Sequence, residues 1–139
     1  MYKMASLVID TSALLAVLLN EPTRPALIQV AEGYSLVGAP SLPWEVGNAL
    51  IAGVRRKRLS AAALRQVWAS YRRVPVRLAE VDAANALEIA MELQLYAYDA
   101  YVLETARTER LRLLTLDRGM ERAARQLGVR IVEYEHEGL

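Results

Sequence analysis

Short apolar runs alternate along the chain with segments in which apolar residues recur at helical spacing. Pro, Gly, Ser or Asp stands at most of the boundaries, as is typical where a strand gives way to a helix. The apolar runs predict strands over 7–10, 34–39, 74–78, 112–117 and 129–134. The periodic segments predict helices over about 11–20, 25–33, 42–56, 61–73, 83–93, 98–110 and 118–127.

Small polar residues precede most of the predicted helices and are expected to be their N-caps. These residues are Thr11 or Ser12, then Ser41, Ser60 and Asp82. Pro25 and Pro43 fall in the first turn of a helix, where proline is tolerated, and Gly33 and Gly128 are expected to end helices.

The predicted strands are nearly continuous in apolar residues and are separated by helices. This order favours a parallel sheet that is covered on both faces. Right-handed crossovers then produce an α/β fold, a three-layer α/β/α sandwich around a central, mostly parallel sheet. With 139 residues and no linker or repeat, the chain is expected to form a single domain over 1–139.

Composition excludes several classes of protein. Hydrophobic residues make up 54% of the chain, which argues against disorder, and the lack of Cys excludes disulfides and thiolate zinc sites. The one histidine, His136, near the C-terminal end, argues against a His-based metal cluster, a Ser-His-Asp triad or a Cys-His pair. The longest apolar run, 13–19, is too short to span a membrane. We read no signal peptide in the first ten residues and expect a soluble, cytoplasmic protein.

The basic residues are almost all arginine, with fifteen Arg against two Lys and a net charge of only +1. Codon usage, a hot habitat and phosphate recognition are all open explanations. The cluster RRKR over 55–58 could guide an RNA backbone, or could be a solvated helix C-terminus that the helix dipole favours.

Four acidic residues stand at strand ends or helix starts. Asp10 and Asp117 close two predicted strands, so parallel neighbours would bring both to one edge of the sheet. Asp99 and Glu45 lie in the first turns of predicted helices, on faces shared with apolar residues. All four carboxylates are therefore expected near one edge, whereas most of the other glutamates are expected to be solvated.

Each acid also has a structural interpretation on its own. Asp10, Asp99 and Asp117 could be helix caps, and Glu45 could pair with a buried arginine. Asp82 fits a helix cap better than a site residue.

Four clustered carboxylates repel one another unless some are protonated or cations hold them together. A site of oxygen ligands alone suits Mg²⁺ or Mn²⁺, and two such ions form a clamp for displacement at phosphorus. The hydroxyls of Thr115, Thr11 and Ser12 are placed to orient water or a carboxylate, or else serve as strand filler and helix caps.

The motifs DTSALLA (10–16), EVGNAL (45–50), YDAYVLETA (98–106) and TLDRGM (115–120) resemble, in order and spacing, those of PIN-domain ribonucleases. The VapC-type toxins of prokaryotic toxin–antitoxin pairs are the closest match, and the likeness covers roughly 7–133. The resemblance implies a Mg²⁺- or Mn²⁺-dependent endoribonuclease, with tRNA or rRNA as the suggested substrate. By position, Asp10, Glu45, Asp99 and Asp117 match the family's metal-binding acids, and Thr115 matches a hydroxyl beside the last acid.

The resemblance also implies two protein partners. These are a second copy of the chain in a homodimer and a small antitoxin whose tail lies across the site. Three aromatic residues flank the acids, namely Trp44, Tyr96 and Tyr98, and could stack on unpaired bases or pack in the core or a dimer interface.

Other classes of protein fit the sequence less well. A haloacid-dehalogenase-type phosphatase would need a second Asp where Ser12 stands, and a receiver domain would need a late Lys, whereas the only lysines are Lys3 and Lys57. A non-catalytic RNA-binding or protein-interaction module that retains the fold is the main alternative.

Overall fold

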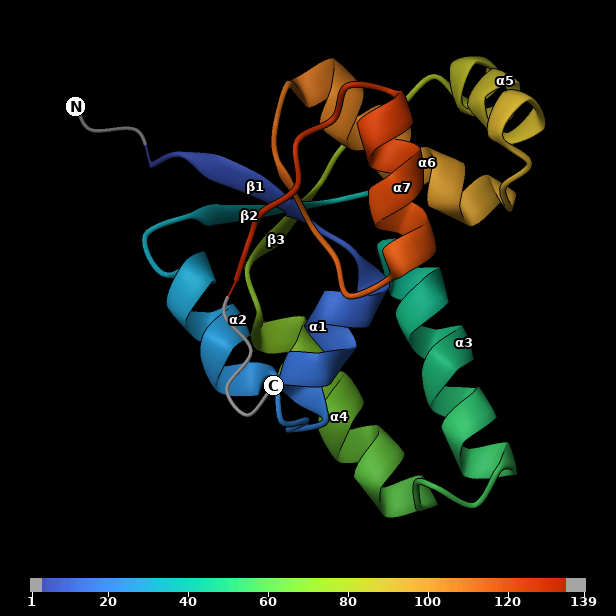
Figure 1. Cartoon of the computed structure of the whole chain (residues 1–139). Helices are drawn as coiled ribbons and strands as arrows, with labels where there is room; N and C mark the ends of the chain where they lie inside the picture. Colours follow the sequence, from blue (N-terminus) through green and yellow to red (C-terminus); the bar gives the residue numbers. More distant parts are fainter. Residues whose placement is uncertain (1–3, 135–139) are drawn as a thin grey trace.

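The computed structural model describes residues 4–134, in which strands and helices alternate (Figure 1). The strands are β1 (Ser6–Ile9), β2 (Ser35–Gly38), β3 (Val76–Leu78) and β4 (Leu113–Leu114). The helices are α1 (Thr11–Leu18), α2 (Arg24–Ala31), α3 (Leu42–Arg55), α4 (Ala61–Arg73), α5 (Ala83–Leu93), α6 (Ala97–Glu109) and α7 (Arg118–Gln126). His136 lies outside the described residues.

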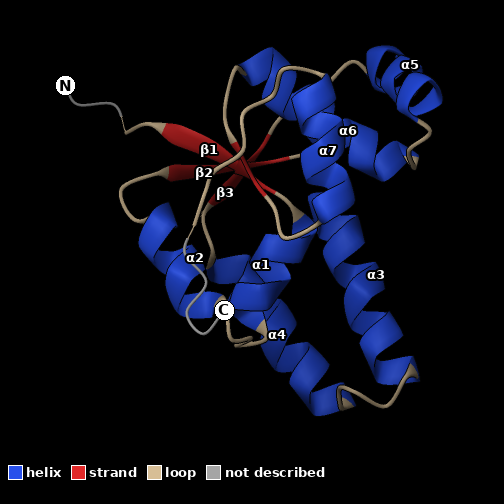
Figure 2. Ribbon diagram, in the orientation of Figure 1, coloured by secondary structure: helices blue, strands red, loops and turns tan. Residues whose placement is uncertain are grey.

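The four strands form one parallel sheet in the order β3-β2-β1-β4. Figure 2 labels three of them, β1, β2 and β3, among the surrounding helices. Strand β1 is central and pairs with β2 on one side and with β4 on the other. In the second pair Ile9 is the partner of Leu114, so the two strands end at the same level. The residues that follow β1 and β4 therefore leave the sheet side by side.

Helices cover both faces of the sheet, which confirms the predicted three-layer α/β/α architecture (Figure 1). Because side chains alternate along a strand, Val8 enters the core under α5, α6 and α7, while Leu7 and Ile9 enter the core under α1, α2 and α3. Each core is built from buried Leu, Val and Ala side chains. Burial of apolar surface on both faces accounts for the nearly uninterrupted apolar strands.

Ser60 and Asp82 cap their helices as expected, whereas Ser41 stands at the N-cap position of α3 but its side chain makes no capping hydrogen bond. Ser60 accepts a hydrogen bond from the Ala63 amide, and Asp82 accepts one from the Ala84 amide. Gly33 and Gly128 adopt φ values of 82° and 75°, a left-handed conformation that suits glycine after a helix. No helix within residues 4–134 has the length and apolar character needed to cross a membrane.

Two expectations about local structure were wrong. Neither Thr11 nor Ser12 caps α1, because Asp10 occupies the N-cap position and accepts the Ala13 amide. The predicted strand over 129–134 is reduced to one parallel bridge, between Ile131 and Leu113. Strand pairing depends on the neighbouring strand, and β4 offers only two residues to pair with.

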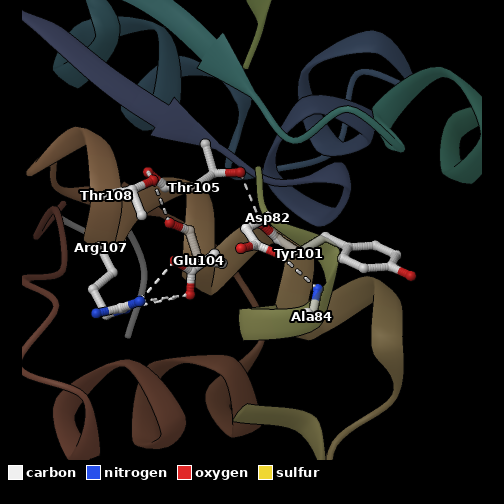
Figure 3. Close-up of polar contacts among 7 residues, drawn as sticks. All are labelled: Asp82, Ala84, Tyr101, Glu104, Thr105, Arg107 and Thr108. Carbon is white, nitrogen blue, oxygen red and sulfur yellow. Dashed lines mark hydrogen bonds and ion pairs between the residues drawn. The ribbon is translucent and has the colours of Figure 1, made fainter. Parts of the chain in front are cut away.

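Most glutamates outside the site were expected to be solvated, but Glu104 is an exception, since it is 0% exposed on the buried side of α6. Arg107, one turn along the helix, reaches back to its carboxylate, with Nη2 2.7 Å from Oε1 and 2.9 Å from Oε2 (Figure 3). The buried charge is thus compensated by a cation from its own helix, whose side chain is partly open to solvent. A second ion pair, between Arg77 and Glu109, lies at the surface.

Arg107→Ala is expected to lower the free energy of unfolding by about 3 kcal/mol, because it leaves the Glu104 carboxylate buried without a partner. Arg77→Ala is the control, since it breaks an arginine–glutamate pair of the same residue types in an exposed position, where solvent screens the interaction. Urea unfolding of both variants measures the difference. Equal effects of the two substitutions would contradict the importance assigned to burial.

Candidate metal centre

The ends of β1 and β4 place Asp10 and Thr115 together. Asp10 is only 4% exposed, and its amide donates to the carbonyl of Leu114, which continues the pairing of the two strands. The Thr115 hydroxyl, fully buried, donates to Asp10 Oδ2. A side chain from the first strand is therefore held by one that lies more than a hundred positions later in the sequence.

Ser12 closes a small network around the same carboxylate. Its hydroxyl donates to Asp10 Oδ1 at 2.7 Å and accepts the Leu116 amide at 3.0 Å. The Ala13 amide also donates to Asp10 Oδ1, at 3.0 Å. The Asp10 carboxylate therefore both caps α1 and links the ends of β1 and β4. These hydrogen bonds together fix the orientation of the carboxylate.

Asp117 lies at the rim of this network and is exposed. Its Oδ1 accepts the amides of Gly119 and Met120 at 2.8 and 3.2 Å, so it caps α7. Its own amide donates to Thr115 Oγ1 at 3.0 Å. The capping role considered for Asp10 and Asp117 is therefore real for both residues, and it places their carboxylates at the carboxyl edge of the sheet.

Glu45 and Asp99 approach from the first turns of α3 and α6, and both are half-buried. Glu45 Oε2 accepts the Ser41 hydroxyl at 2.8 Å, rather than a buried arginine. Thr11 Oγ1 is buried and makes no hydrogen bond of regular geometry with a described residue, yet it lies close enough to Glu45 to favour the charged form of that carboxyl.

Three of the four acids, namely Asp10, Glu45 and Asp99, are affected electrostatically by a neighbouring acid. Burial raises the pKa of Asp10, Glu45 and Asp99 above the ordinary values of their carboxyls. Repulsion by Asp117 adds to the rise in the pKa of Asp10 and of Asp99, and Asp99 and Asp10 add to that of Glu45. The predicted acids are thus neighbours within Coulombic range of one another.

The influences on the pKa values of Asp10, Glu45 and Asp99 come from burial, from hydrogen bonds and from neighbouring acids, and no arginine or lysine of the described residues is among them. The donors are carboxylate and hydroxyl oxygens, the ligand type of Mg²⁺ and Mn²⁺. In the part of the chain that the structure describes, no three Asp, Glu or His side chains lie close enough to hold one ion as they stand. Mg²⁺ is commonly bound by one or two carboxylates together with water and substrate phosphates, so the donor set fits this ion.

The RRKR cluster lies at the opposite end of α3 from Glu45, and all four of its side chains are exposed. Arg55 is in the last turn of the helix, where the helix dipole favours a cation. The position agrees with the solvated helix end considered from the sequence, and it keeps these charges away from the carboxylates.

The profile of the PIN domain family matches residues 7–126, so the chain belongs to the PIN domain family. No curated protein sequence gave a significant match.

Three solved structures illustrate the likeness of the fold. PAE2754 from Pyrobaculum aerophilum is 24% identical, with a TM-score of 0.68 over 88% of this chain and 92% of that one. VapC20 from Mycobacterium tuberculosis, described as a sarcin–ricin-loop-cleaving toxin, is 16% identical, with a TM-score of 0.63 over 85% and 95%. VapBC2 from Rickettsia felis, bound to a promoter DNA fragment, is 11% identical, with a TM-score of 0.65 over 93% and 98%. At these identities the comparisons establish the fold.

The buried Asp10 carboxyl makes stability depend on pH in a defined direction. Its pKa in the folded protein is above that of the unfolded chain, so the folded state binds more protons, and the unfolding free energy falls as pH rises through this interval. Asp10→Asn removes this decrease of the unfolding free energy with pH, because the amide does not ionise. In metal-free buffer, the stability of the variant relative to the parent protein should therefore increase as pH rises from about 4, the unfolded value.

Urea unfolding of the two proteins across a pH series measures this difference. If the unfolding free energy of Asp10→Asn minus that of the parent protein stays constant or decreases as pH rises, the result would contradict the burial of an ionisable carboxyl at this position.

Proposed function

We propose that this protein is a Mg²⁺- or Mn²⁺-dependent endoribonuclease, the toxin of a VapBC-type toxin–antitoxin pair, acting in the cytoplasm. The observation that carries the proposal is the buried Asp10 carboxylate, held by Ser12 and Thr115 within Coulombic range of other acids. A buried carboxylate with a raised pKa and like-charged neighbours is costly unless it has a functional role.

The residues that would hold the ions are Asp10, Glu45, Asp99 and Asp117. Bound divalent cations would neutralise the carboxylates, attract the phosphodiester and make water acidic enough to attack phosphorus at neutral pH. Thr115 and Ser12 keep the Asp10 oxygens in a fixed direction, and Ser41 does the same for Glu45. Without cations the same edge would repel a polyanion.

Several structural neighbours support this choice of substrate and partner. VapC20 is described as cleaving the sarcin–ricin loop, which is RNA, and VapBC2 and a further neighbour from Klebsiella pneumoniae are toxin–antitoxin complexes. We therefore propose tRNA or rRNA as the substrate and a small antitoxin as the regulatory partner. The main alternative, a non-catalytic RNA-binding or interaction module, predicts no cleavage.

Cleavage of structured RNA with Mn²⁺ tests the proposal. Asp10→Asn is expected to lower the rate by more than about 100-fold, since it removes a charged ligand. Thr115→Val should lower it by about 10- to 100-fold, because the hydroxyl only orients Asp10. Asp82→Asn, a change of the same chemistry at an exposed helix cap, should leave the rate unchanged.

Cleavage that continues without a divalent ion, or that survives Asp10→Asn, would contradict the proposed mechanism. Absence of cleavage of any tested RNA by the folded parent protein would favour the non-catalytic module.

We also propose that the protein forms a homodimer through the exposed apolar side chains of α3 and α5 described next. Leu87 and Met91 are exposed one turn apart on the same face of α5, and Ile51 is exposed on α3. Large apolar side chains gathered on one face of a surface helix are typical of an interaction surface. A second copy of the chain would remove them from water.

Met91→Glu is expected to raise the dissociation constant of the dimer by at least about tenfold, because it places a charge in an apolar contact. Light scattering during size-exclusion chromatography measures the mass over a range of concentrations. Glu92→Gln, an exposed change at the next position of α5, is the control and should leave the dimer intact. A monomeric parent protein, or a dimer that Met91→Glu does not weaken, would contradict this assignment.

A further inference from the structure

A small pocket opens where α3, α5 and α6 begin. Its volume is about 260 Å³, and its walls include the side chains of Ser41, Trp44, Val81, Tyr98 and Tyr101. The lining is mostly aromatic and aliphatic, in contrast to the acidic edge beside it. Neither the position of the acids nor the family match assigns an occupant to this pocket.

The pocket shares a wall with the candidate metal centre. Ser41 lines the pocket and donates its hydroxyl to Glu45 at 2.8 Å. Trp44 directly precedes Glu45 on α3, and Tyr98 directly precedes Asp99 on α6. A group seated in the pocket would therefore lie next to whatever is bound between the acids.

The aromatic side chains of the pocket are available to a ligand. Trp44 is 71% exposed and Tyr98 is 51% exposed, which excludes the core packing considered for them from the sequence. Tyr98 is supported from behind by an edge-to-face contact with Tyr101, with ring centroids 6.1 Å apart and planes at 71°. A supported, solvent-facing aromatic ring is a stacking platform for another flat ring.

We propose that this pocket holds one unpaired nucleobase of the RNA, stacked on Trp44 and Tyr98, beside the phosphodiester that is cleaved. The proposal rests on the proposed ribonuclease function and adds a requirement for an unpaired base next to the cleavage site. A pocket of this volume suits one ring system better than a peptide helix, which needs a longer groove. Its shared wall with the acids favours a part of the substrate over a second copy of the chain.

Tryptophan fluorescence can report on the pocket directly. The chain has two tryptophans, and Trp68 is partly buried against the core beside Tyr71. Trp68→Phe leaves Trp44 as the only tryptophan, and Asp10→Asn in the same chain prevents cleavage during the titration. The probes are an RNA hairpin with an unpaired loop and a set of the same hairpins, each lacking one loop base.

The intact hairpin is expected to quench Trp44 emission, and removal of one particular loop base should abolish the quenching. In a binding assay with labelled RNA, Trp44→Ala should raise the Kd of the intact hairpin by about 5- to 150-fold, the range for loss of one stacked base. It should not change the Kd of the hairpin that lacks that base. Trp44→Phe should restore most of the affinity, and Tyr34→Ala, an exposed aromatic at the opposite edge of the sheet, should have no effect.

Three results would overturn the nucleobase pocket. The first is cleavage by the parent protein with no dependence on any loop base, which would leave the nuclease standing without the pocket. The second is conversion of a dimer to a monomer by Trp44→Ala with no base-dependent loss of RNA affinity, which would assign the pocket to a second copy of the chain. The third is no binding of either hairpin. Base-dependent quenching, together with no RNA cleavage by the parent protein in the presence of Mn²⁺, would instead support the pocket while the nuclease proposal fails.

Discussion

The Asp10 carboxylate, buried at the end of the central strand, is the constraint on which the arrangement of the site depends. Burial opposes its charge and raises its pKa, while two hydroxyls and one amide hold it in place. One of these hydroxyls, that of Thr115, belongs to the neighbouring strand, so the β1–β4 pairing and the site form together. The same buried carboxylate therefore caps α1 and forms the centre of the candidate site.

Much of the fold could be predicted from the sequence, because buried parallel strands are apolar throughout and most helices begin at a recognisable cap. Ser60 and Asp82 are examples in which a local signal was sufficient. The strand predicted over 129–134 is only a single bridge in the structure, because its partner β4 has only two residues available for pairing. No local sequence pattern reveals the length of the partner strand. The burial of Glu104 was not predicted, because an acid followed by an arginine three positions later is the usual pattern of an exposed helix face. In this structure the acid faces the core.

The residues of the candidate site could be predicted from the sequence for a different reason. An acid at the end of an apolar run, or among apolar residues in a first helical turn, has few structural explanations, and the topology brings such positions to one edge. Within the described residues, repulsion from a neighbouring acid adds to the raised pKa of Asp10, Glu45 and Asp99, which indicates that these positions lie near one another. In the absence of a cation, repulsion among these carboxylates lowers the stability of the fold. Active sites commonly show such a conflict between stability and function.

The contrast between the acidic edge and the aromatic pocket follows from helix geometry. Successive residues of an α-helix point roughly 100° apart, so Trp44 and Glu45 cannot face the same way, and the same holds for Tyr98 and Asp99. On both helices the acid turns toward the end of the sheet, half-buried, and the aromatic residue before it turns toward solvent. Two helices that begin at the same edge thereby produce an apolar surface directly beside a charged one. A nucleotide has the same division, with a flat base on one side and a phosphate on the other, and this match is the physical reason for placing the base in the pocket.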